Sequence, residues 1–140
     1  MRPDTKPSSA TKLPSITYRR LALAWALLIA VLCGIPGKQL PTNHWFDLFS
    51  VDKWVHGFLF FVLCYWLWRG YGKPHAPGWN QTWPFWLASS AYGVLMEVLQ
   101  ATVFVDRSFD YQDMLANSCG ASLAFAWIYW GKKTSQPGRA

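Results

Sequence analysis

Seven polar residues that could do chemistry lie in three short motifs, and within each motif they are three or four residues apart. The motifs are Asp52 with His56, Glu97 with Gln100, and Asp110 with Asp113 and Asn117. Residues at this spacing share one face of a helix, so each motif predicts one polar helix face. An imidazole beside carboxylates is suited to proton transfer near neutral pH. His56, Glu97 and Asp113 are therefore the candidate catalytic residues.

A second group of residues is suited to binding a ligand rather than to reacting with it. Arg107 has a planar guanidinium that can hold a phosphate or a carboxylate through two charge-assisted hydrogen bonds. A salt bridge with a neighbouring acid explains Arg107 equally well. The candidate substrate-binding residues are Asp52, Lys53, Gln100, Arg107, Ser108, Asp110 and Asn117.

Two of these assignments have alternatives that the sequence leaves open. Asp110 and Asp113, with Asp52 and Glu97, could hold a hard divalent cation through oxygen ligands. Carboxylates at the start of a helix can equally cap it and complement its dipole, so no metal and no cofactor is assigned. His56 can also serve only as a hydrogen bond between two helices.

Four apolar segments carry these motifs. The chain has 140 residues, of which 25 are aromatic and only 20 are charged, which excludes a disordered, charge-solvated chain. A bilayer core of roughly 30 Å requires about 17 to 25 mostly apolar residues per helix. With their polar flanks the segments reach this length, and we expect helices at about residues 18–35, 52–69, 83–105 and 111–130. The predicted fold class is all-α, a single-domain polytopic bundle of four transmembrane helices.

The basic residues orient this bundle. If the N-terminus is cytoplasmic, ten of the 13 Lys and Arg residues lie on the inner side, and only Lys38, Lys53 and Arg107 lie outside. Short cytoplasmic segments of membrane proteins carry such an excess. The asymmetry favours a membrane protein over a soluble bundle with short buried helices. Residues 1–17, which read as disordered, and residues 131–140 are the expected cytoplasmic tails, and the polar motifs lie at the outer side.

Composition also excludes other classes of protein. The net charge of +6 does not indicate nucleic-acid binding, because the ten Trp residues are not interleaved with basic residues as a stacking platform would require. Cys33, Cys64 and Cys119 lie in apolar runs without CxxC spacing, so we expect buried thiols rather than a disulfide framework or a zinc site. The first apolar segment lacks a signal-peptidase site and is expected to be a retained helix.

Glu97 is the residue that most needs an explanation. An ionisable group inside a membrane costs roughly 2.5 to 3.5 kcal/mol on insertion scales. Glu97 is expected about two turns below the outer end of its helix, too deep to reach the surface easily. Protonation, or pairing with His56 or Arg107, would relieve this cost, and the sequence does not choose between them.

The three motifs together resemble those of the VanZ-like family of small bacterial membrane proteins, over about Val51 to Gly120. They read Asp52-Lys53-x-x-His56, Tyr92-Gly93-x-x-x-Glu97-x-x-Gln100 and Arg107-Ser108-x-Asp110-x-x-Asp113-x-x-Ala116-Asn117-x-x-Gly120. The resemblance implies a multi-pass protein of the bacterial cytoplasmic membrane. The family takes its name from a gene associated with teicoplanin resistance, so a role in glycopeptide or envelope-stress resistance is expected.

We therefore expect a polar pocket that opens at the outer leaflet and handles an envelope lipid head group or a cell-wall component. In this hypothesis Arg107 holds an anion, while His56 and Glu97 transfer protons. The alternative is a non-enzymatic accessory or binding protein whose polar residues form a structural core. A proton or ion pathway is disfavoured, because no matching polar residues occur in the cytoplasmic half of the helices. Membrane lipids are the expected partners, and nucleic acid is not.

Overall fold

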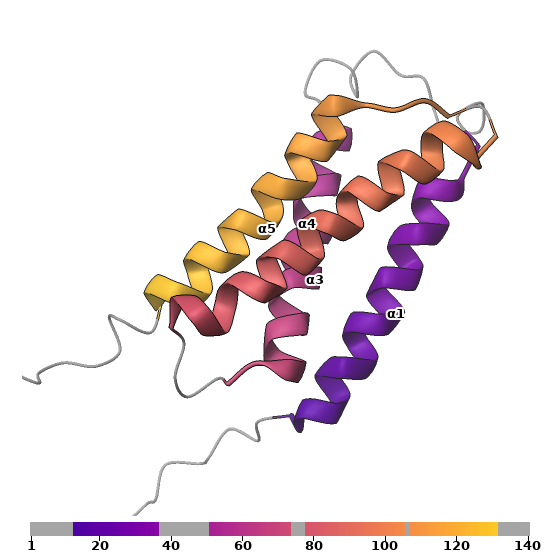
Figure 1. Cartoon of the computed structure of the whole chain (residues 1–140). Helices are drawn as coiled ribbons and strands as arrows, with labels where there is room; N and C mark the ends of the chain where they lie inside the picture. Colours follow the sequence, from indigo (N-terminus) through magenta and orange to yellow (C-terminus); the bar gives the residue numbers. More distant parts are fainter. Residues whose placement is uncertain (1–12, 37–50, 74–77, 106, 132–140) are drawn as a thin grey trace, which may run out of the picture.

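The protein is described by a computed structural model that covers residues 13–36, 51–73, 78–105 and 107–131. These residues form four helices and, within the described ranges, no strand. The helices are α1 (Ser15–Gly34), α3 (Val51–Tyr71), α4 (Trp79–Thr102) and α5 (Tyr111–Gly131), and each runs antiparallel to the one before it (Figure 1). The predicted all-α chain of four helices is confirmed.

The helix bounds differ most from the expected ones at α4. This helix begins at Trp79, four residues before the expected start, and ends at Thr102, three residues before the expected end. Pro84 is the sixth residue of the helix, so its missing N–H removes one helical hydrogen bond, to the carbonyl of Asn80. At the other end the backbone N–H groups of Val103 and Phe104 both donate to Leu99 O, which closes the last turn. Of the expected tails, residues 1–12 and 132–140 lie outside the described residues, and Ser15 already belongs to α1.

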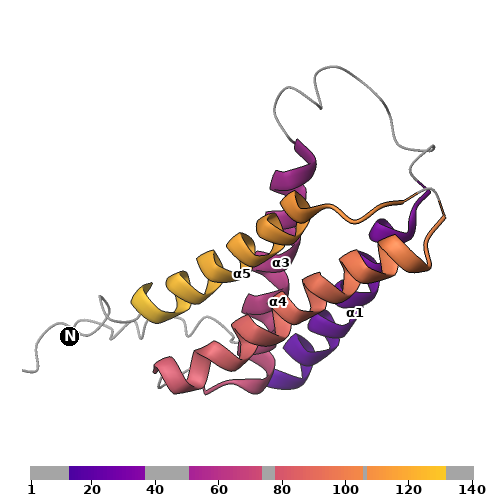
Figure 2. The same ribbon diagram turned by 45° about the horizontal axis from the view of Figure 1, so that its top comes forward.

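The central helix is α3, which packs against all three others and most extensively against α5. In both views α4 lies between α5 and α1 (Figure 1, Figure 2). The closest approach is between Gly57 on α3 and Gly120 on α5, where a methyl group at Gly120 would collide with the carbonyl oxygen of Gly57. Small residues at this crossing set the distance between the two helices.

The core has two parts, and both include α3. Ile29, Phe60 and Met96 join α1, α3 and α4 in the larger part, while Cys64 and Ala121 join α3 and α5 in the smaller. All three cysteines are free thiols. The expectation that they are buried holds for Cys33 and Cys64 and is wrong for Cys119, because that position of α5 faces outward.

The helices bury polar side chains and expose apolar ones. Glu97 and Ser89 are fully buried, and Asn117 and Thr82 are 1% exposed. Large apolar residues are half or more exposed on all four helices, among them Leu23, Leu27, Val31, Phe58, Trp79, Leu115 and Leu123. Among the described helices, α1 alone has the length and composition to cross a membrane, so the four membrane spans stay a prediction. The buried polar groups therefore need partners inside the bundle.

Candidate functional site

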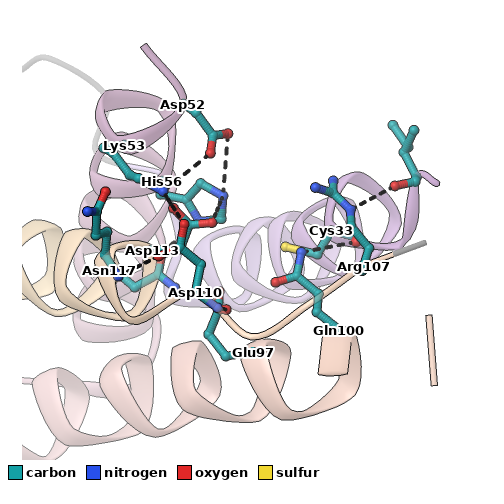
Figure 3. Close-up of polar contacts among 12 residues, drawn as sticks. Cys33, Asp52, Lys53, His56, Glu97, Gln100, Arg107, Asp110, Asp113 and Asn117 are labelled. Atoms are coloured by element: carbon teal, nitrogen blue, oxygen red, sulfur yellow. Dashed lines mark hydrogen bonds and ion pairs between the residues drawn. The ribbon is translucent and has the colours of Figure 1, made fainter. Parts of the chain in front are cut away.

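The three predicted polar motifs meet at one end of the bundle, where α3 and α5 begin and α4 ends (Figure 1). Antiparallel order brings these ends together although the first motif is about 40 to 60 residues from the other two in the sequence. Figure 3 shows one group of side chains, here named the polar cluster. The polar cluster consists of Asp52, Lys53, His56, Asp110, Asp113 and Asn117.

Lys53 lies at the centre of the polar cluster. Its Nζ donates to Asp110 Oδ2 at 2.7 Å and to Asp113 Oδ1, and lies 3.8 Å from Asp52 Oδ2. The Lys53 ammonium holds the pKa of the Asp110 carboxyl below its usual range. Asp110 also caps α5, because its Oδ1 accepts a hydrogen bond of 2.7 Å from the backbone N–H of Gln112. One carboxylate thus starts the helix and binds the lysine, so the expected helix cap is present.

His56 is buried between two helices and is held from one side. Its Nδ1 lies 3.0 Å from Asn117 Oδ1, which can only accept, so Nδ1 carries the proton and donates it. Its Nε2 faces two carboxylates, Asp52 Oδ1 at 3.8 Å and Asp113 Oδ2 at 3.7 Å. These two distances are too long for hydrogen bonds. The imidazole is therefore fixed in orientation while one of its nitrogens stays open.

Glu97 lies behind the polar cluster and is fully buried. Its Oε2 accepts a hydrogen bond of 3.0 Å from the backbone N–H of Asp110. The partner is thus a backbone group, rather than the expected His56 or Arg107. Its Oε1 has no hydrogen-bond partner among the described residues. Glu97 ties the link before α5 to α4, and half of its carboxyl group remains uncompensated.

Arg107 and Gln100 form a separate group at the end of α1 (Figure 3). Arg107 Nε donates to Ile35 O at 3.0 Å, and Gln100 Nε2 donates to Cys33 O at 3.2 Å. The last carbonyls of a helix lack partners within it, and these side chains supply them. No described contact joins Arg107 to His56, so the structure does not bring the expected anion holder and proton donor together. Ser108 is exposed in the link between α4 and α5.

Comparison with known proteins extends the resemblance beyond the three motifs. Residues 11–132 match the family model described as VanZ/LLP1. The chain belongs to the VanZ/LLP1 family. No curated protein and no solved structure matches it. Because the match includes α1, the VanZ-like domain is the whole four-helix unit, and the polar cluster lies at one end of it.

The VanZ-like bundle also has an apolar groove that the sequence reasoning missed. The groove lies between α3 and α5, has a volume of about 370 Å³ and begins at Lys53. It is lined by Lys53, Trp54, Gly57, Phe58, Phe61, Ala116, Cys119, Gly120 and Leu123. The spacing of Lys53, Gly57 and Phe61 places them on one helix face and could have revealed the groove. The small residues Ala116 and Gly120 suggested only helix packing.

Proposed function

We propose that this VanZ-like protein spans the bacterial cytoplasmic membrane four times and binds an envelope lipid from the outer leaflet. The polar head group lies at the polar cluster, and an acyl chain lies in the groove between α3 and α5. Both termini are cytoplasmic in this proposal. It keeps the expected outer-leaflet pocket but moves head-group binding from Arg107 to Lys53.

The distribution of side chains supports the membrane part of the proposal. In a bilayer, ionisable and polar side chains face the bundle interior and apolar side chains face lipid. Glu97 and Asn117 are buried, while Leu27 on α1 and Leu123 on α5 are more than half exposed. An apolar surface around all helices is rare in soluble monomers. The excess of basic residues in the segments assigned to the inner side points the polar cluster outward.

The observation that carries the lipid proposal is that the groove starts at a lysine and continues along apolar residues. Gly57 and Phe61 lie one and two turns beyond Lys53 on α3, so the groove runs along the helix. The ammonium of Lys53 has three N–H donors and uses two of them on Asp110 and Asp113. The third can donate to a head-group oxygen while an acyl chain occupies the groove.

Native mass spectrometry of protein extracted gently from its own membrane tests this proposal. We expect a retained lipid that is lost in Cys119→Phe, which fills the exposed middle of the groove without touching the polar cluster. Leu115→Phe is the matched control, because Leu115 is 61% exposed on the same helix and does not line the groove. Equal lipid in all three samples, or none in the wild type, would overturn lipid binding.

A structural role is the second candidate, since the polar contacts already join α3, α4 and α5 without any ligand. A folded wild-type protein without lipid would favour it. An enzymatic form of the lipid proposal assigns proton transfer to His56 and Asp113, whose Nε2 and Oδ2 face each other. Conversion of the bound lipid by the wild type and not by His56→Gln would support it. The proposed cellular role, tolerance of glycopeptides or envelope stress, is tested by deletion and antibiotic challenge.

A further inference from the structure

Three electron-rich atoms converge on one point at the outer edge of the polar cluster. Asp52 Oδ1, His56 Nε2 and Asp113 Oδ2 all lie within 4.8 Å of one another. No hydrogen bond joins them, since His56 Nε2 is 3.8 Å and 3.7 Å from the two oxygens. Such a separation leaves room for an atom between them.

The protonation of His56 makes this arrangement specific. Because Nδ1 donates its proton to Asn117 Oδ1, the neutral ring presents a lone pair at Nε2. A lone pair and two carboxylate oxygens repel one another unless a proton or a metal cation lies between them. Histidines that bind metals typically donate their other N–H to a second-shell oxygen, which fixes the ring as Asn117 does here.

Asp52 and Asp113 each place one carboxylate oxygen toward Lys53 and the other toward His56. This arrangement suits an ion that both residues bind. Asp113 Oδ1 accepts from Lys53, and Oδ2 faces His56. Asp52 likewise has Oδ2 on the Lys53 side and Oδ1 on the His56 side. Lys53 therefore holds the carboxylates in place without occupying the oxygens that face the imidazole.

Glu97 adds a further acidic group beside these carboxylates. It is fully buried, its Oε1 has no partner among the described residues, and Figure 3 shows its side chain extending toward Asp110. Three carboxyl groups thus lie around one ammonium, and a fourth is bonded to the backbone of Asp110. Buried charges in proteins are paired or bind metals.

We propose that Asp52, His56 and Asp113 bind a divalent transition-metal ion of the Zn²⁺ type, with a fourth position open toward the outer side. One imidazole nitrogen and two carboxylate oxygens are a ligand set that zinc accepts, at about 2.0 to 2.2 Å from the ion. Tetrahedral ligands at that distance are about 3.4 Å apart, so the two separations from His56 Nε2 need to close by a few tenths of an ångström. The two carboxylates, whose ligand atoms lie within 4.8 Å of each other, need to approach by up to about 1.4 Å, and the exposed Asp52 side chain is free to make that movement. The site does not depend on the lipid proposal, although an ion there would give a head-group oxygen a ligand position.

Zinc titration of the full-length protein, purified in detergent without a histidine tag, tests the proposal against a chromophoric chelator. We expect one Zn²⁺ per chain. His56→Gln and Asp113→Asn should each weaken binding about 100-fold, and Asn117→Ala about 10-fold through loss of ring orientation. The matched controls are His44→Gln and His75→Gln, which remove the other two imidazoles of the chain, and Cys119→Ser, which removes the exposed thiol. The controls should bind like the wild type.

Asp52→Asn covers the case in which the buried variants fail to fold, because the Asp52 side chain is 67% exposed. It should fold normally and weaken binding at least 10-fold. X-ray absorption of the bound zinc should show nitrogen and oxygen neighbours only. Undiminished binding by Asp52→Asn, loss of binding in a control, sulfur in the first shell, or no binding by the wild type would overturn the site. Zinc retained by a lipid-free Cys119→Phe would separate this result from the lipid proposal.

Discussion

The two ends of the bundle use charged residues in opposite ways. At the end where α1 begins and α3 finishes, Arg69 donates to Tyr18 Oη at 3.0 Å and lies over the Tyr18 ring at 4.6 Å. Arg19 donates to Gly70 O at 2.8 Å and lies over the Tyr71 ring at 4.7 Å. No described carboxylate contacts either arginine. At the other end, an ammonium and an imidazole lie beside carboxylates, and Glu97 Oε1 has no partner in the part of the chain that the structure describes.

This difference distinguishes an end whose charged residues anchor the bundle from an end whose charged residues can bind a ligand. An arginine on a tyrosine ring is stabilised by that ring and by the hydrogen bond that it donates. At the other end three carboxylates contact one ammonium, so that end has a capacity for an additional positive group. Polar groups occur at both ends, and the sign of the excess charge distinguishes the candidate site.

The largest expected loss of stability comes from a substitution that pushes α3 and α5 apart, because this helix pair reaches both ends of the bundle. Gly120→Ala places a methyl group against the backbone carbonyl of Gly57, which cannot move like a side chain. We expect a loss of about 3 kcal/mol in the free energy of unfolding, at the upper end for overpacking. Gly131→Ala is the control, since nothing lies within 4 Å of a methyl group there. Equal unfolding of the two variants in mixed micelles would disprove the close contact.

Replacing one positively charged side chain at each end compares how much that side chain contributes to stability. Lys53→Met leaves the buried Asp113 and its neighbour Asp110 without their charged donor, and should cost about 2 kcal/mol. Arg69→Met removes a ring contact and one hydrogen bond near the surface, and should cost less than about 1 kcal/mol. Unfolding in mixed micelles compares them. A larger loss of stability in Arg69→Met than in Lys53→Met would contradict the proposal that the polar cluster is the end with the buried, dependent charges.

A smaller effect is expected where α4 supports the polar cluster. Gly93→Ala places a methyl group 3.0 Å from Asn117 Cβ and 3.2 Å from the Phe60 ring, so Asn117 must shift. We expect about 1 kcal/mol of destabilisation, and a zinc affinity lowered several-fold because Asn117 orients His56. Gly78→Ala, at the cap residue before the same helix, places a methyl group with no described atom within 4 Å and is the control. Unchanged zinc affinity in Gly93→Ala would show that the ring is held by other contacts.

The smallest expected effect is the pH dependence of the Lys53–Asp110 pair. The folded-state pKa of Asp110 is lowered, so the stability from this pair is present above the unfolded value of about 3.9 and is lost as the pH falls through the folded value. Asparagine keeps the helix cap, so Asp110→Asn removes only the charge. Wild type should be more stable than Asp110→Asn near pH 6, and this difference should shrink toward pH 3. A difference independent of pH would contradict the ion pair.

The sequence predicted the helices and the meeting of three polar motifs because both follow from local patterns. Apolar segments set the number of helices, and antiparallel order brings Asp52, Glu97 and Asp113 to one end. The pairing of individual atoms depends on helix rotation, which local spacing does not encode. Arg107 therefore binds Ile35 O at the end of α1 instead of facing His56. The groove was missed because it depends on how far apart α3 and α5 lie, which the contact at Gly57 determines.

The groove opens sideways between two helices, and its outer rim includes Trp54, Phe58 and Leu123, which are 77%, 61% and 63% exposed. A lipid could then reach Lys53 by diffusing within the leaflet, without passing through water. The concentration that governs occupancy would be the mole fraction of that lipid in the membrane. Nanodiscs of graded lipid composition would therefore report affinity in the relevant units, and dilution of the aqueous phase would leave occupancy unchanged.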